Sequence, residues 1–340
     1  GNSAGVGGGG IFVAQTALNL NNVTITDNTS SDDGGGIVAG TMITNMKNSI
    51  IAGNTATNDL WGGEDCRGQI NSQDYNLVQV DTCLFIAAHD ITGVSPLLNP
   101  LADNGGLTQT HSLGVGSPAM NAGNNATCAA TDQRGIARPQ GARCDIGAFE
   151  VEMLSLTLRS LGAQDGWTLE SGENTTVGGT MDSAATTFRL GDDAQDKQYR
   201  AILHFNTAGL PDNAVITKVT LKIRKQGQSG SDPFTILGGL TVDMRRPSFG
   251  TAALALGDFQ AAAGRSAVAA FGAAPVSNWY SAILNGQGRN YLNKVGATQF
   301  RLSFATDDND NGIADYMTFI SGDHATASFR PTLIIEYYAP

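Results

Sequence analysis

The sequence predicts an all-β protein: a short right-handed parallel β-helix (a solenoid) followed by an antiparallel β-sandwich or jelly roll. Three observations predict it. Residues 10–55 repeat with a spacing of 26 positions, residues 186–338 contain segments that alternate apolar and polar side chains, and the composition is rich in glycine (43 of 340 residues) and poor in charge (15%). We expect a β-helix domain at 1–152 with an irregular, disulfide-bonded C-terminal end, and a jelly-roll domain at 153–340.

The repeat brings the same residue types to matching positions of successive turns. The matching pairs include Gly10 and Gly36, Ile11 and Ile37, Asn22 and Asn48, Asn28 and Asn54, and Thr29 and Thr55. A period of this length is typical of one supersecondary unit stacked on the next. We expect stacked asparagine side chains to hydrogen-bond one another and glycines to occupy corners with positive φ. A chance similarity between Gly/Asn-rich loops is the alternative, because only two turns are clear.

The net charge of the chain limits the classes of partner that it can bind. The net charge of −11 argues against nucleic acid, because phosphate binding needs clustered Lys and Arg side chains. The acidic excess lies in residues 1–152, which hold 14 acidic and 5 basic residues, against 17 and 15 in residues 153–340. No apolar run approaches the roughly 18 residues of a spanning helix, so we expect no membrane insertion.

All four cysteines lie in the first half of the chain, at Cys66, Cys83, Cys128 and Cys144. Four cysteines allow three pairings. Pairing between sequence neighbours, Cys66–Cys83 and Cys128–Cys144, closes loops of similar length in Gly/Asn-rich stretches where a small core needs cross-links. Two disulfides predict a secreted protein of the cell surface.

The second half changes character. Alternating runs occur at 186–192, 199–205, 215–225, 240–246, 298–306, 315–321 and 331–338. About eight strands with turn signals between them are typical of an antiparallel sandwich or jelly roll.

Two parts of the chain resemble known families. The words "PLADNGGLTQTHSL", "GSPAMNAG", "TDQRGIARP" and "CDIGAFE" occur in order between positions 100 and 150. With them, residues 60–152 resemble the choice-of-anchor Q module, which closes secreted bacterial β-helix proteins. This resemblance implies a secreted surface protein whose attachment signal follows the module, and no catalytic activity.

The segments "YRAILHFNTAGLPDNAVITKVTLKI" (199–223) and "SGDHATASFRPTLIIEYY" (321–338) resemble the DNRLRE family over about residues 163–338. Its jelly-roll domains are similar to carbohydrate-binding modules found beside polysaccharide lyases. The resemblance implies glycan contact in some members, but no defined sugar-binding motif is present, so it assigns no sugar-binding residue.

The segment "DDNDNGIAD" (307–315) has oxygen-bearing residues at alternate positions and a glycine, Gly312, for a sharp bend, as a calcium-binding loop requires. The candidate ligands of a structural Ca²⁺ ion are Asp307, Asn309, Asn311, the carbonyl group of Ile313, and Asp315. The position of the usual bidentate glutamate holds Thr318. The alternative is a polar hairpin loop that binds nothing, and the sequence leaves both open.

A glycan-binding module is the second functional hypothesis. Trp279, Tyr280 and Tyr291 lie in a loop-rich stretch and are candidate stacking platforms for sugar rings. Core packing is the usual fate of such aromatic side chains.

A polysaccharide lyase or hydrolase is the least favoured hypothesis. The four histidines have no serine or cysteine nucleophile motif near them, and Asp132 beside Arg134 and Arg138 reads as a structural ion pair. We therefore expect no enzymatic activity.

The leading hypothesis is an extracellular structural or adhesive protein, with a self-assembling filament subunit as its most specific form. A solenoid of two or three turns has an open strand edge, which folded proteins normally cover. The expected partners are copies of this chain in head-to-tail contact, or an upstream part of the same protein. Polysaccharide is the partner that the glycan-binding hypothesis adds.

Overall fold

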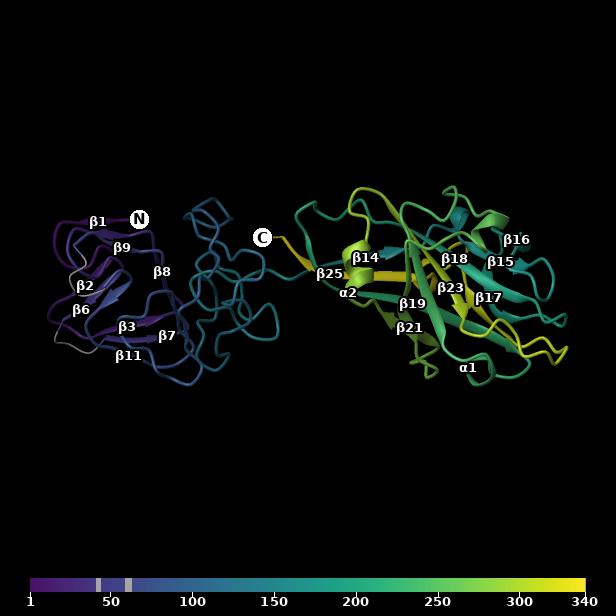
Figure 1. Cartoon of the computed structure of the whole chain (residues 1–340), viewed down its shortest axis with the longest axis horizontal. Coiled ribbons are helices and arrows are strands. Elements are labelled where there is room, and N and C mark those ends of the chain that lie inside the picture. Colours follow the sequence, from purple (N-terminus) through teal and green to yellow (C-terminus); the bar gives the residue numbers. More distant parts are fainter. Residues whose placement is uncertain (41–43, 59–62, 340) are drawn as a thin grey trace. The chain divides into compact units, whose positions relative to one another are not determined.

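The computed structural model describes residues 1–40, 44–58 and 63–339 of an all-β chain (Figure 1). The chain forms two compact units, Gly1–Met153 and Leu154–Ala339. We call them unit 1 and unit 2 and describe each by itself. In the described residues, each helix has at most six residues, and none is long and apolar enough to cross a membrane.

In the part of unit 1 that the structure describes, short strands form four small sheets, and every pairing between these strands is parallel. The strands are β1 (Ser3–Ala4), β2 (Ile11–Val13), β3 (Leu18–Asn21), β4 (Thr24–Thr26), β5 (Thr29–Ser30), β6 (Ile37–Ala39), β7 (Thr44–Lys47), β8 (Ile50–Ala52), β9 (Thr55–Ala56), β10 (Cys66–Arg67), β11 (Ile70–Ser72), β12 (Leu77–Val78) and β13 (Ile91–Thr92). The sheet orders are β1-β5-β9, β10-β6-β2, β11-β7-β3 and β13-β12-β8-β4.

Paired residues in the first two turns of these sheets are 26 positions apart, which is the spacing of the sequence repeat. Ile11 pairs with Ile37 and Leu18 pairs with Thr44, and the same offset relates β1 to β5 and β4 to β8. The parallel pairing that the repeat predicted is therefore present. The next turn is less regular: Ile37 pairs with Cys66 across 29 positions, whereas Thr44 pairs with Ile70 across 26 and Ile50 with Leu77 across 27.

A narrow apolar core runs through the stacked strands. Ile37, Met46 and Ile51 are fully buried in one cluster, and Ile25 lies directly in register with Ile51. Side chains alternate along β2, so Phe12 points outward and is 60% exposed while its neighbour Val13 is buried.

Two ladders of polar side chains, built mainly from asparagines, run along the stacked strands. In the buried ladder, Asn28 Nδ2 donates to Asn54 Oδ1 (3.0 Å), and Asn54 Nδ2 donates to Asp65 Oδ1 (2.9 Å). An exposed ladder on another face joins Asn71 to Asn45 (2.7 Å) and Asn45 to Asn19 (2.8 Å).

The prediction that the side chains of Asn22 and Asn48 hydrogen-bond each other is wrong. The two residues occupy matching corners with positive φ, but their amides bond elsewhere. Asn22 Nδ2 donates to the carbonyl oxygen of Asp145, and Asn48 Nδ2 donates to Thr127 Oγ1. The reason is that a later segment of unit 1 lies against these corners and supplies closer partners.

In unit 2, twelve strands form one curled antiparallel sheet (Figure 1). They are β14 (Leu154–Arg159), β15 (Gly166–Glu170), β16 (Gly178–Asp182), β17 (Thr187–Asp192), β18 (Gln198–Asn206), β19 (Val215–Ser229), β20 (Leu240–Arg245), β21 (Arg265–Phe271), β22 (Trp279–Ile283), β23 (Ala297–Phe304), β24 (Tyr316–Ile320) and β25 (Thr332–Tyr338). The helical turns are η1 (Gly162–Gln164), α1 (Pro233–Ile236), η2 (Leu256–Asp258), α2 (Gly286–Tyr291) and η3 (Ala327–Phe329).

The long strand β19 holds this sheet together. Its first part pairs with β25 and β22, and its last part, after a register shift between Lys225 and Gly227, pairs with β24. A bulge bends a strand, so the two parts belong to differently directed regions of one sheet. The side chains between these regions form a single core that includes Phe188, Phe300 and Phe319.

The two asparagine ladders predict different effects on stability. Asn54→Ala removes the side-chain amide that donates to the buried Asp65 and accepts from Asn28, so we expect the free energy of unfolding to fall by about 2–3 kcal/mol. Asn45→Ala removes the same chemistry where water can replace it, and the expected loss is below about 1 kcal/mol. Calorimetric unfolding of the full chain measures both. Equal losses would show that burial of the first ladder does not matter.

Candidate functional site

The acidic loop lies between β23 and β24. Asp315 is fully buried, and its Oδ2 atom accepts hydrogen bonds from Asn309 Nδ2 (3.2 Å) and Asn311 Nδ2 (2.9 Å). The structure thus brings together three of the five predicted calcium ligands. Asp307 and Ile313 are exposed, and the Ile313 N–H group donates to Asn311 Oδ1 (2.6 Å).

Two further carboxylates lie against this loop, and sequence reasoning missed both. Asp192, the last residue of β17, accepts at Oδ1 from the N–H group of Asp315 (3.1 Å), and Asp196 accepts from that of Gly312 (3.0 Å). Strands β17 and β24 pair with Gly191 opposite Tyr316, which places the turn after β17 beside the loop before β24. The acidic stretch 192–196 was the only signal in the sequence.

The two buried carboxyl groups titrate differently. Burial raises the pKa of Asp192 to about 6, and the neighbouring charges of Asp315 and Asp196 add to this rise. Burial also acts to raise the pKa of Asp315, but hydrogen bonds from Asn311, Ser231 and Asn309 outweigh it and lower the pKa. Within the described ranges, no group of three or more His, Cys, Asp and Glu side chains is arranged to hold a metal ion.

The three aromatic candidates do not form one surface. Tyr280 is 3% exposed and stacks on Phe234 with ring centroids 5.4 Å apart, so this side chain belongs to the core and cannot receive a sugar ring. The sequence hypothesis for Tyr280 is therefore wrong. Tyr291 is half-buried, and the guanidinium groups of Arg246 and Arg265 lie 4.5 and 4.8 Å from its ring centroid.

Trp279 remains accessible and lines a shallow cleft of about 240 Å³ on the outer face of β14, β25, β19 and β22. Arg159 and Lys222 line the same cleft, and Lys222 Nζ lies 5.4 Å from the Trp279 ring centroid. Arg224 is paired with Trp279 across the two strands. An aromatic ring beside several cations is thus found on an otherwise acidic protein.

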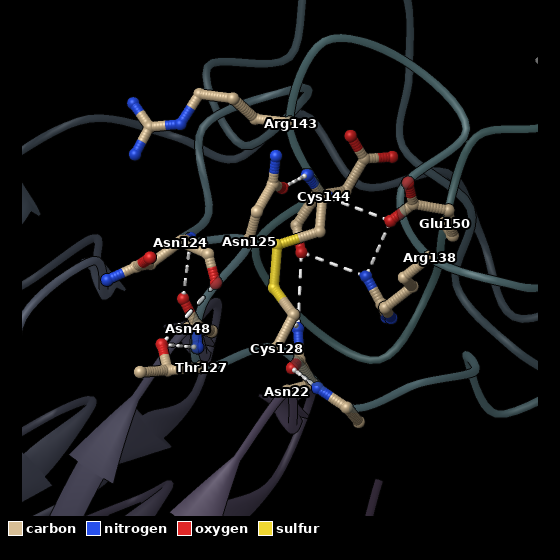
Figure 2. Close-up of a disulfide and its surroundings, with 12 residues drawn as sticks. Asn22, Asn48, Asn124, Asn125, Thr127, Cys128, Arg138, Arg143, Cys144 and Glu150 are labelled. Carbon is tan, nitrogen blue, oxygen red and sulfur yellow. Dashed lines mark hydrogen bonds and ion pairs between the residues drawn. A yellow bond between two sulfur atoms is a disulfide. The ribbon is translucent and has the colours of Figure 1, made fainter.

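The disulfides of unit 1 join Cys66 to Cys83 and Cys128 to Cys144, which is the pairing expected from the sequence. Figure 2 shows the second disulfide beside the corner residues Asn22 and Asn48. Asn48 Oδ1 accepts from the N–H group of Asn124 (2.9 Å), so the disulfide-bonded segment is tied to the stacked strands.

Buried charges hold the end of this segment. Arg138 Nη1 lies 2.7 Å from Glu150 Oε2, and both side chains are buried (Figure 2). Arg134 pairs with Asp132 at 2.8 Å, as the sequence predicted for this ion pair. Burial, followed by the charge of Glu150, raises the pKa of Asp145 to about 7. These charged side chains bind one another inside the protein, so they stabilise the structure of the segment.

The first turn of unit 1 has an open edge. Among the described strands, β2, β3 and β4 each pair with one neighbour only, in the second turn. A cleft of about 330 Å³ lies at this edge, and its lining includes Ile11, Ile25 and Thr26 from the first turn and His111 and Gln133 from the later segment. Apolar side chains and unpaired backbone groups therefore meet at one surface.

Comparison with known proteins adds no assignment: no model of a known protein family matches the chain, and the search of curated proteins finds no match.

The raised pKa of Asp145 predicts a pH dependence. Its pKa is about 7 in the fold and near 3.8 in an unfolded chain, so the folded state binds the proton more tightly and the free energy of unfolding rises as the pH falls from about 7 towards 4. Asp145→Asn cannot take up this proton. We expect the gain in Tm between pH 8 and pH 5 to be smaller in this variant than in the wild type, with Asp103→Asn, at an exposed position of unit 1, as control. An unchanged gain would exclude Asp145 as the titrating group.

Proposed function

We propose that this protein is an extracellular structural or adhesive component of a cell surface, built from a short right-handed parallel β-helix and a jelly roll. In this proposal the chain assembles head to tail with copies of itself into a filament. The observation that carries it is the open edge of the first turn, formed by β2, β3 and β4.

Physical chemistry favours covering this edge. Each strand of the first turn offers backbone N–H and C=O groups on its open side, and such rows are templates for another chain. The cleft beside them also has apolar lining, from Ile11, Val23 and Ile25. At the other end of the stack, β9, β10, β11 and β13 are likewise edge strands in the described part of the chain. Two different ends that meet head to tail form a heterologous contact, and such a contact generates a filament when its rotation does not close into a ring.

The disulfides support an extracellular location, because such bonds persist outside the cytoplasm. The resemblance of residues 60–152 to the choice-of-anchor Q module points in the same direction. The proposal assigns no catalytic activity to the chain. The charged residues of that module, such as Arg134 and Arg138, are engaged in buried ion pairs.

The test is a charge placed inside the proposed contact. Ile11 lies in register with Ile37 and Cys66, so an added turn would stack directly on it. We expect Ile11→Lys to weaken self-association at least about tenfold, because an inward charge blocks strand addition. Phe12→Lys, on the same strand but pointing outward, is the matched control and should keep association. Light scattering with negative-stain microscopy of the full chain gives the readout.

A wild-type chain that stays monomeric at high concentration would contradict the filament proposal. In that case an upstream part of the same protein would be the expected partner of the open edge. Equal effects of the two lysine variants would show that the contact lies elsewhere.

A second candidate function is binding of an acidic polysaccharide in the cleft at Trp279. The cations Arg159 and Lys222 beside an accessible indole ring favour it, since sugars stack on aromatic faces and carboxylate or sulfate groups pair with cations.

Lys222→Ala and Trp279→Ala should each weaken binding of a polyuronate by about tenfold, the equivalent of about 1.4 kcal/mol. Lys47→Ala, in unit 1, changes the net charge equally and should have no effect. Titration calorimetry separates the outcomes, and a loss of binding that is equal in all three variants would indicate nonspecific attraction.

A further inference from the structure

The junction of two loops in unit 2 contains buried oxygen atoms that no group in the protein satisfies. Asp192 is fully buried, and its Oδ2 atom has no hydrogen-bond partner. Asn309 Oδ1, on the opposing loop, is also buried and without a partner. A buried polar atom that makes no hydrogen bond costs free energy, so a pair of them at one place indicates a missing ligand.

Both residues contact Asp315, which is itself buried. Asn309 Nδ2 is 3.2 Å from Asp315 Oδ2, and the backbone N–H group of Asp315 is 3.1 Å from Asp192 Oδ1. The N–H group of Asp192 in turn donates to the carbonyl oxygen of Asp315 (3.1 Å). This reciprocal pairing holds Asp192 and Asp315 opposite each other on the two neighbouring strands.

The surrounding charge is strongly negative. The turn after β17 carries Asp192, Asp193 and Asp196, and the loop before β24 carries four more aspartates at positions 307–315. The one cation in these two segments, Lys197, pairs with Asp193 at 3.2 Å. The ligand that would neutralise this site is therefore a cation.

We propose that these two loops bind one Ca²⁺ ion, with Asp192, Asp315 and Asn309 as its protein ligands. All three donors are oxygen atoms, which calcium prefers, and the two segments contain no histidine or cysteine that would favour zinc. Calcium tolerates irregular geometry and accepts water molecules or loop carbonyl groups at its remaining positions. The amide of Asn309 can turn its oxygen atom towards Asp315 once a cation lies between them.

This ligand set differs from the one expected from the loop sequence. A loop that binds calcium by itself uses ligands at alternate positions, whereas here one carboxylate comes from a strand more than 100 residues earlier. Bound calcium then joins the β17–β18 turn to the β23–β24 loop. The inference is independent of self-association, because all its residues lie in unit 2.

The test uses Asp192→Asn in the full chain. The asparagine keeps an oxygen atom to accept from the Asp315 N–H group, but it removes the negative charge. We expect wild-type protein to bind Ca²⁺ with a Kd below about 1 mM, as extracellular calcium modules do, and to gain several degrees in Tm that a chelator reverses. Asp192→Asn should bind at least about tenfold more weakly, and in chelator it should melt no lower than the wild type, because one of two repelling charges is gone.

Asp310→Asn is the matched control. It removes the same charge from the opposing loop, Asp310 is exposed, and its φ of 55° is one that asparagine adopts readily. This variant should keep the calcium response, and Asn309→Ala should lose part of it.

Titration calorimetry and thermal melts with CaCl₂ or MgCl₂ decide the outcome. Three results would overturn the proposal: no heat and no Tm shift with wild-type protein, an equal loss in Asp192→Asn and Asp310→Asn, or Mg²⁺ binding as tightly as Ca²⁺. The first means that a proton or water satisfies Asp192, and the second means diffuse attraction by the acidic loops.

Discussion

Unit 1 depends on one constraint: each strand must find its backbone partners one turn away, in register. The 26-residue offset meets this constraint and brings like side chains together, such as Ile11 on Ile37 and Asn28 on Asn54. A buried amide can be satisfied only if the next turn places another polar group above it, as Asp65 does for Asn54. The same constraint explains why the two ends of the stack expose backbone groups that can pair with another strand. Nothing inside a turn can satisfy its outer backbone groups, so the first and last turns depend on other segments or other chains.

The disulfide-bonded segment of unit 1 packs against the corners of the stack. Asn22 and Asn48 lie at corners where φ is positive, and there the backbone turns away from the strand ladder. Their side chains are thus available to Asp145 and Thr127. The buried pair of Arg138 and Glu150 contributes little net stability, because desolvation offsets its attraction. We infer that it selects one arrangement for a segment that has almost no regular secondary structure.

Features that repeat in the sequence could be predicted from it, and features that depend on distant pairing could not. The offset predicted parallel pairing, and alternation predicted segments that became β17, β18, β19, β20, β23, β24 and β25. Strands such as β16 (Gly178–Asp182) and β22 (Trp279–Ile283) lack clear alternation or have few apolar residues, so no local signal marks them. The acidic loop was visible because its residues are contiguous. Asp192 was not, because only the pairing of β17 with β24 brings it to Asp315. Burial of Tyr280 was likewise decided by its partner Phe234, which is distant in sequence.

The crowding of Asp192 and Asp315 follows from core packing rather than from the loops themselves. Phe188 and Phe319 pair across β17 and β24, and their rings stack with centroids 5.5 Å apart. A shift of one residue in this pairing would turn both phenylalanines out of the core, so the register is fixed by apolar burial. The register then forces the ends of the two strands, with their carboxylates, to meet. Sheet packing is too costly to change for the sake of one repulsive contact. The repulsion must therefore be relieved locally, by a proton or by a bound cation, and this links the stability of unit 2 to the solution around it.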